Sequence, residues 1–200
     1  MKNNTVKLTA LGSTSALALI AATTNAQALD FYAGLSAGVA FGDIPSPGDT
    51  DYPEDYSLSG AVLGGFAGVK STLNNGMMIG FELALSGPTE GDSDENSSYD
   101  YSYDVNWTLD SKLRVGTNIG NIMVYGFGGF TFGNASNYWV QSGYSFSGTN
   151  VGIGAEMELA NGMTVGIEGI QRNLSGYGSD SNDASNQSSQ AISARVGFTF

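Results

Sequence analysis

The chain ends in the stretch ISARVGFTF, residues 192–200, in which every second residue is apolar. Arg195 lies at the centre of the intervening positions, which are otherwise small or polar. Strict alternation of this kind has the period of a β-strand with one apolar and one polar face. The apolar face of this terminal strand holds Ile192, Ala194, Val196, Phe198 and Phe200.

The same alternation recurs along the chain and predicts a protein built of strands. The 29 glycines, 10 tyrosines and 10 phenylalanines favour strands and tight turns over helices. One face of the first strand, for example, carries Phe31, Ala33, Leu35, Ala37, Val39 and Phe41. We predict eight strands, at about 31–41, 58–70, 77–86, 101–115, 122–132, 151–159, 163–172 and 192–200.

The connections between these strands alternate in length. Short turns are expected at 71–76, 118–121 and 160–162, and long polar loops at 43–57, 87–100 and 175–189. Residues 133–148 are assigned to neither class, since Tyr138, Trp139, Tyr144 and Phe146 suit a membrane interface and the strands can extend into this region. Short turns at one end and long loops at the other are typical of an up-and-down membrane barrel. The predicted fold is therefore an all-β, eight-stranded antiparallel up-and-down transmembrane β-barrel.

A soluble β-sandwich or lipocalin-like barrel is the alternative. Such folds bury the apolar strand faces inside the protein, with most of the charged faces in water. The aromatic residues at the ends of the apolar faces, such as Phe31, Phe41 and Phe198, instead match the aromatic girdles of membrane barrels.

The N-terminus has the pattern of a cleavable signal peptide over residues 1–28. Lys2 and Lys7 precede an apolar stretch, and Ala26-Gln27-Ala28 is an A-x-A cleavage site before Leu29. The mature domain would then be residues 29–200. A transmembrane anchor is the alternative, but the apolar stretch is short and interrupted for a bilayer span of about 20 residues.

Charge placement predicts an ionic cluster inside the barrel. The mature chain would have five basic residues, all on the non-apolar strand faces, and five acidic residues share those faces. The interior of an eight-stranded barrel is just filled by side chains, so we expect these charges to pair there. The predicted structural cluster is Glu82, Asp110, Lys112, Arg114, Glu156, Glu158, Glu168, Arg172 and Arg195, with Lys70 on the same face of a less regular strand. The other acids fall in or near the loops and account for a mature net charge of −14.

Several short motifs resemble the outer-membrane β-barrel superfamily, which includes the OmpA transmembrane domain, OmpX and alphaproteobacterial porin-like surface proteins. They are Lys112-Leu-Arg114-Val-Gly116, Gly152-Ile-Gly154-Ala-Glu156, Asn161-Gly162-Met163 and the ending Ser193 to Phe200. The resemblance spans residues 29–200 and implies an outer-membrane location. It also implies that the alternate apolar residues ending at Phe200 are the signal read by the barrel assembly machinery. The chain departs from the family at Gly169, where relatives often place an aromatic residue.

Catalysis is not expected. The chain has no histidine or cysteine, so neither the usual general base nor thiolate chemistry is available. Glu156 and Glu158 form the one remaining carboxylate pair, and an ionic role is favoured over an acid–base or ion-conducting one. Asp92 to Asn96 begins like a calcium-binding EF-hand loop, but Ser97 and Tyr103 replace the required Gly and Glu.

The expected function is a non-enzymatic structural or surface-interaction role through acidic external loops. The alternative is a small porin-like channel for ions or small solutes. Expected partners are outer-membrane lipid, the barrel assembly machinery, and divalent cations or surface ligands at the loops. No cofactor is expected, and the acidity disfavours nucleic acid. A loose divalent site could involve Asp49, Asp51, Glu54, Asp55 and the acids that follow Asp92.

Overall fold

The computed structural model describes residues 29–43, 57–90, 103–137, 144–159, 161–177 and 186–200. Within these ranges, no helix is long and apolar enough to cross a membrane. The strands are β1 (Asp30–Asp43), β2 (Ser57–Thr72), β3 (Met77–Gly87), β4 (Thr89–Glu90), β5 (Tyr103–Ile119), β6 (Ile122–Asn137), β7 (Tyr144–Glu158), β8 (Met163–Tyr177) and β9 (Asn186–Thr199).

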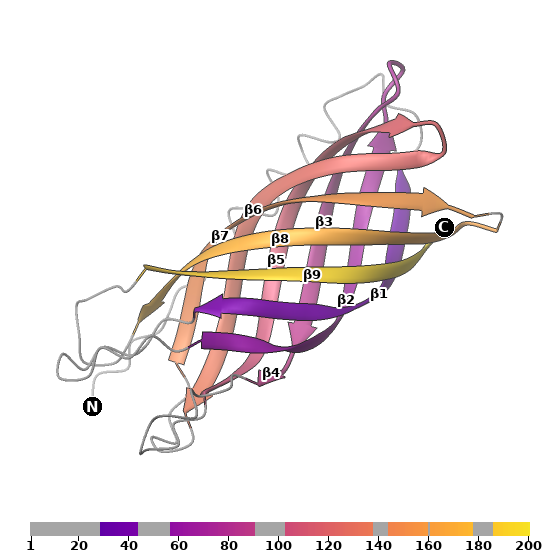
Figure 1. The fold of residues 1–200 in the computed structure, drawn as a ribbon. Helices are drawn as coiled ribbons and strands as arrows, with labels where there is room; N and C mark the ends of the chain where they lie inside the picture. The colour runs from indigo at the N-terminus through magenta and orange to yellow at the C-terminus, as the bar shows by residue number, and fades with distance from the viewer. Residues whose placement is uncertain (1–28, 44–56, 91–102, 138–143, 160, 178–185) are drawn as a thin grey trace.

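These strands form one closed antiparallel barrel (Figure 1). Sequential strands pair with each other, and β9 pairs with β1 to close the sheet. The two-residue β4 continues β3 beyond Pro88, because both pair with β5. Proline lacks the N–H that a strand ladder requires, which explains the interruption. The barrel wall therefore has the eight strands predicted from the sequence.

The strand register shows how strongly the barrel is sheared. A line of paired residues that starts at Tyr32 on β1 and follows the sheet once around returns to β1 at Gly42, ten residues further along. Such a stagger accompanies the strand tilt that closure requires. The line passes through Gly68, Glu82, Lys112, Gly129, Asn150, Arg172 and Ser189.

The two faces of the sheet differ as the alternation predicts. Large apolar side chains point outward and are exposed, for example Phe31 at 53% and Ile153 at 72%. The charged residues Glu82, Lys112 and Arg114 point inward and are almost wholly buried. The three tight turns, the start of β1 and the end of β9 lie at one end of the barrel (Figure 1). We call this the turn end, and the opposite end the loop end.

Two predicted side-chain positions near the loop end are wrong. Strict alternation over 101–115 would place Val105 on the outer face with Trp107, but Val105 points inward and is 5% exposed. The cause is a β-bulge between these residues, since an extra residue in a strand reverses the facing of what precedes it. Phe146 was expected to suit the membrane interface, yet it is buried inside the barrel. Tyr138 and Trp139 lie outside the described residues.

The strands also extend further toward the loop end than the apolar pattern indicates. β6 continues to Asn137 and β7 begins at Tyr144, so much of 133–148 is strand. β8 continues to Tyr177 and β9 begins at Asn186. Outward positions in these extensions are polar, such as Asn134 and Ser147, so apolar alternation ends before the hydrogen-bond ladder does.

Candidate functional site

The centre of the barrel is crossed by a network of three acidic and three basic side chains. Glu82 on β3 and Lys112 and Arg114 on β5 contribute from one side. Glu156 on β7, Glu168 on β8 and Arg195 on β9 contribute from the other. We call these six residues the central network. Because the strands alternate, residues two apart such as Lys112 and Arg114 point into the same interior.

Glu82 is the hub of the central network. One carboxylate oxygen accepts a hydrogen bond from Lys112 Nζ at 3.2 Å and another from Arg195 Nη1 at 3.1 Å. The other accepts from Arg114 Nη1 at 2.8 Å, from Arg195 Nη2 at 2.5 Å and from the Tyr32 hydroxyl at 3.1 Å. Glu82 is fully buried, so these donors replace water around its charge.

The other two carboxylates connect the same cations. Glu168 accepts from Lys112 Nζ at 2.5 Å and also pairs with Arg195 Nη1. Glu156 Oε1 accepts from Arg114 Nη2 at 2.8 Å and lies 3.6 Å from Arg195 Nε. Each cation therefore contacts two or more carboxylates, and the six charges balance.

Aromatic rings fill the space around the cations. The guanidinium carbon of Arg114 lies 3.8 Å from the centre of the Tyr125 ring, and that of Arg195 lies 3.8 Å from the Phe66 ring centre. Lys112 Nζ is 4.9 Å from the Phe127 ring centre. A cation over an aromatic face gains electrostatic attraction, and these rings exclude water from the network. Salt bridges and rings together cross the middle of the barrel.

A second ion pair lies nearer the loop end. Arg172 on β8 donates from Nε at 3.1 Å and from Nη2 at 2.7 Å to the two oxygens of Asp110 on β5. The Thr131 hydroxyl donates to Asp110 at 2.6 Å, and Asn150 Nδ2 donates to Thr131 at 3.1 Å. This bidentate geometry is the strongest arrangement for an arginine and a carboxylate.

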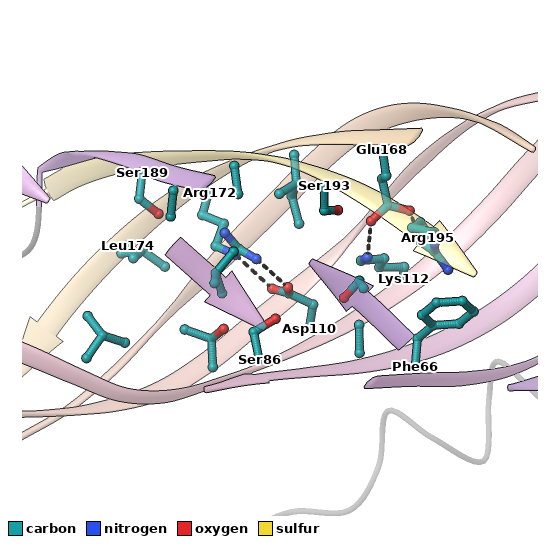
Figure 2. A pocket seen from close by; sticks show the side chains of 18 of the residues that line it. Phe66, Ser86, Asp110, Lys112, Glu168, Arg172, Leu174, Ser189, Ser193 and Arg195 are labelled. Atoms are coloured by element: carbon teal, nitrogen blue, oxygen red, sulfur yellow. Dashed lines mark hydrogen bonds and ion pairs between the residues drawn. The ribbon is translucent and has the colours of Figure 1, made fainter. Parts of the chain in front are cut away.

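A cavity of about 50 Å³ separates the second ion pair from the central network. Figure 2 shows Arg172 and Asp110 at one side of it, and Glu168, Lys112 and Arg195 at the other. Small side chains including Ser86 and Ser193 leave this space open. A water molecule occupies about 30 Å³ in the liquid, so the cavity is water-sized.

The loop-end part of the interior is apolar. Phe146 and Leu174 are buried there, beyond the second ion pair along their strands, and Ile170 is buried on β8 between that pair and the central network. A membrane barrel usually has a polar interior, so this tier is unlike an aqueous vestibule. We call it the apolar tier; its members are Ala40, Val62, Val105, Ala135, Phe146, Ile170, Leu174 and Ala191.

The structure does not bring Glu158 into the central network. Glu158 is exposed and makes no ion pair with any described residue. It lies two residues nearer the turn end than Glu156 and lines a pocket of about 130 Å³ with Lys70 and Asp30. Lys70 Nζ is 5.8 Å from the centre of the Tyr32 ring. An inward-facing position is therefore not enough to predict membership of the central network. The depth of a side chain along the barrel axis also decides which charges meet.

Sequence reasoning missed the neutral members of the site. Tyr32 and Tyr125 donate hydrogen bonds to the carboxylates, and Thr131 and Asn150 complete the second ion pair. Each occupies an inward position on its strand, so the alternation that located the charges could have located them too.

Comparison with known proteins assigns the family. The sequence profile described as the outer membrane protein beta-barrel domain matches residues 12–200. This chain belongs to that family. It is a bacterial outer-membrane protein, and the exposed apolar faces of its strands contact outer-membrane lipid. Among curated protein sequences, no significant match exists.

Two solved structures of such proteins have the same fold. Neisserial surface protein A (NspA) aligns with a TM-score of 0.58 at 15% identity, over 87% of this chain and 100% of that chain. OprG from Pseudomonas aeruginosa aligns with a TM-score of 0.54 at 14% identity, over 87% and 97%. At these identities the likeness concerns the fold alone.

The remaining predicted residues are only partly described. Ile192, Ala194, Val196 and Phe198 point outward on β9, and the Phe200 N–H donates to the Phe31 carbonyl at 2.9 Å. Ala26 and Ala28 lie outside the described residues, as do the acids of 49–55 and 92–95. Within the described part, no group of three or more carboxylates is arranged to hold a metal ion.

Proposed function

We propose that this protein is a non-conducting barrel that holds acidic external loops at the cell surface. The single observation that supports this most is the central network. Its three cations and three carboxylates join strands from opposite sides of the barrel across its middle. A rigid, closed barrel of this kind serves as a scaffold for the chain segments between its strands.

Planar-bilayer recording of the refolded protein tests the closed barrel. We expect no steady unitary current at moderate voltage. Heat-modifiable electrophoretic mobility of the same preparation serves as the control that the inserted protein is folded. A steady open-channel current from the folded wild type would contradict the proposal.

The alternative is a narrow channel for ions or small solutes. The cavities of about 50 and 130 Å³ flank the central network on its two sides, so the interior is hollow on either side of the barrier. The buried Nε atoms of Arg114 and Arg195 donate no hydrogen bond to any described residue, so the network is not saturated. Reproducible conductance steps in the recording above would favour this alternative.

A surface-interaction role is proposed from the charge of the chain. Thirteen of the nineteen acids fall at or beyond the loop end of the strands. Such a surface attracts cations and positively charged partners. Calcium titration of the protein in neutral vesicles tests the cation part. Replacing Asp49, Asp51 and Asp55 by Asn and Glu54 by Gln should weaken binding, whereas replacing Glu158 at the turn end should not.

The proposal also holds that the protein is not an enzyme. The carboxylate of Glu156 is occupied by Arg114 and Tyr125, and Glu158 lies outside that contact. A carboxylate pair for acid–base chemistry would need two groups at one substrate position. Lipid turnover that is present in the wild type and lost in Glu156→Gln and Glu158→Gln variants would contradict this part.

A further inference from the structure

The lipid-facing surface has a groove at the middle of β8. Gly169 points outward there between Ile153 on β7 and Ile192 on β9, its partners in the ladder. A Cβ placed on Gly169 would meet no atom within 4 Å. The groove has a volume of about 360 Å³ and is walled by Phe41, Val151, Ile153 and Ile192. A side chain is thus missing at the centre of an otherwise bulky apolar surface.

Two amide side chains lie at the loop-end side of this groove. Gln171 on β8 and Gln190 on β9 are paired in the ladder, and both line the groove. Gln190 Nε2 donates to Gln171 Oε1 at 2.9 Å. Within the described residues, this leaves the Gln171 NH₂ group and the Gln190 carbonyl without partners. Free amide N–H donors and one free carbonyl acceptor therefore face the membrane.

The amide pair lies deeper in the membrane than Phe41, the aromatic residue beside it on β1. Gln190 pairs with Phe41, the last apolar outward residue of β1, and Gln171 pairs in turn with Gln190. The line of paired residues described above leaves β1 through β2 and returns to β1 ten residues nearer the loop end. Followed in the other direction, it descends by about one residue per strand in an eight-stranded barrel. Gln171 is therefore level with Val39, about two residues deeper than Phe41.

Polar groups at this depth need hydrogen-bond partners. An unsatisfied amide facing hydrocarbon costs several kcal/mol in general, and water is scarce below the interface. A lipid that places both a donor and an acceptor beside the start of an acyl chain would satisfy the pair. An amide-linked, hydroxylated acyl chain has both groups there, whereas an ester-linked chain offers acceptors alone.

We propose that the groove over Gly169 binds one lipid with an amide-linked, hydroxylated acyl chain. The chain lies between Ile153 and Ile192, and its amide and hydroxyl groups bond to Gln171 and Gln190. Two features of the protein support this occupant over a second barrel. The groove is continuous with the lipid-facing surface of the strands, and its donor and acceptor complement those of the lipid.

Native mass spectrometry of the full-length protein tests this with two lipid probes. The protein is incubated in mild detergent with lipid A, which has amide-linked hydroxyacyl chains, or with dipalmitoyl phosphatidylethanolamine, which has ester-linked ones. We expect one retained lipid A per barrel and no comparable retention of the phospholipid. Gly169→Leu, which fills the groove, and the double variant Gln171→Leu/Gln190→Leu should each weaken lipid A retention about tenfold.

Matched variants provide the controls. Gly126 on β6 also points outward with room for a side chain, so Gly126→Leu should retain lipid A as the wild type does. Asn106→Leu removes an outward amide that is bonded to Asn134 elsewhere on the barrel, and it should also have no effect. Heat-modifiable mobility confirms folding of every variant.

Three results would overturn the proposal. The first is unchanged lipid A retention in folded Gly169→Leu. The second is equal retention of the phospholipid with the same dependence on Gly169, which would reject the amide and hydroxyl contacts. The third is a barrel dimer that is lost in Gly169→Leu, which would assign the groove to a second copy of the chain.

Discussion

The central network and the apolar tier both face the barrel interior, but they stabilise the barrel differently. Both consist of inward-facing residues on the same strands, for instance Arg195 and Ala191 on β9 or Glu156 and Phe146 on β7. The network depends on matched charges and fixed geometry, because each group is costly to bury alone. The tier depends on volume and shape, because its contacts are dispersive and tolerate exchange of similar side chains.

This difference suggests a division of tasks along the barrel axis. A balanced ionic barrier has one favourable arrangement, so it fixes how the strands are placed around the barrel. An apolar layer packs the loop-end part of the interior without imposing specific partners. The following predictions test that division, beginning with the largest expected effect.

Arg114→Ala should destabilise the barrel most, by about 3–5 kcal/mol, because it leaves the three carboxylates of the central network with two cations. Urea unfolding of the refolded protein in lipid vesicles, followed by tryptophan fluorescence, measures the effect. Asp51→Asn, a change in a loop, is the control and should leave the midpoint unchanged. A larger effect for Asp51→Asn than for Arg114→Ala would reverse the assignment of inside and outside.

Phe146→Ala should cost about 3 kcal/mol, since removing a buried aromatic side chain loses its transfer free energy and leaves a cavity. The matched control is Phe132→Ala on β6, an outward residue that is 48% exposed. The same unfolding measurement should show a smaller effect for Phe132. Equal effects would mean that the apolar tier contributes no packing beyond contact with lipid.

The second ion pair should show strong coupling between its members. Asp110→Leu and Arg172→Met should each lower the free energy of unfolding. The loss in the double variant should be about 2 kcal/mol smaller than the sum of the two single losses. The reason is that the two changes together remove both buried charges. Additive effects in this double-mutant cycle would show that the 2.7 Å contact between Arg172 and Asp110 contributes little.

Glu158→Gln should change stability least, by less than about 0.5 kcal/mol, as for other exposed positions. Glu156→Gln is its matched partner, two residues away on β7 and bonded to Arg114. Unfolding midpoints of the two variants should therefore differ clearly. Equal losses would place Glu158 in the central network after all.

Much of the fold could be predicted because side-chain alternation is a local property. Each outward apolar residue of β1 and β9 follows from the period of two, and turn lengths indicate the order of the strands. Prediction failed where a single backbone irregularity changed the period. The bulge before Trp107 turned Val105 inward, and the chain around it carries no glycine or proline that indicates a bulge.

The charged residues of the candidate site could be predicted, apart from Glu158, but not the contacts among them. Alternation places Glu82, Lys112 and Glu158 on inward faces and does not distinguish their depths in the barrel. Which of them meet depends on the shear of the sheet, because strands far apart in sequence are offset along the axis. The ten-residue stagger brings Lys112 to Glu82 and Glu168 and leaves Glu158 near the turn end.

The sequence by itself determined a β-protein with a lipid-compatible outer face, a charge-balanced inner face and strongly acidic loops, since these follow from the identity and spacing of residues along each strand. Tertiary structure alone decided the register, and with it the partners of Glu82, the position of the apolar tier and the groove over Gly169. The physical reason is that side-chain facing is set within one strand, whereas depth is set by hydrogen bonds between strands all around the closed barrel.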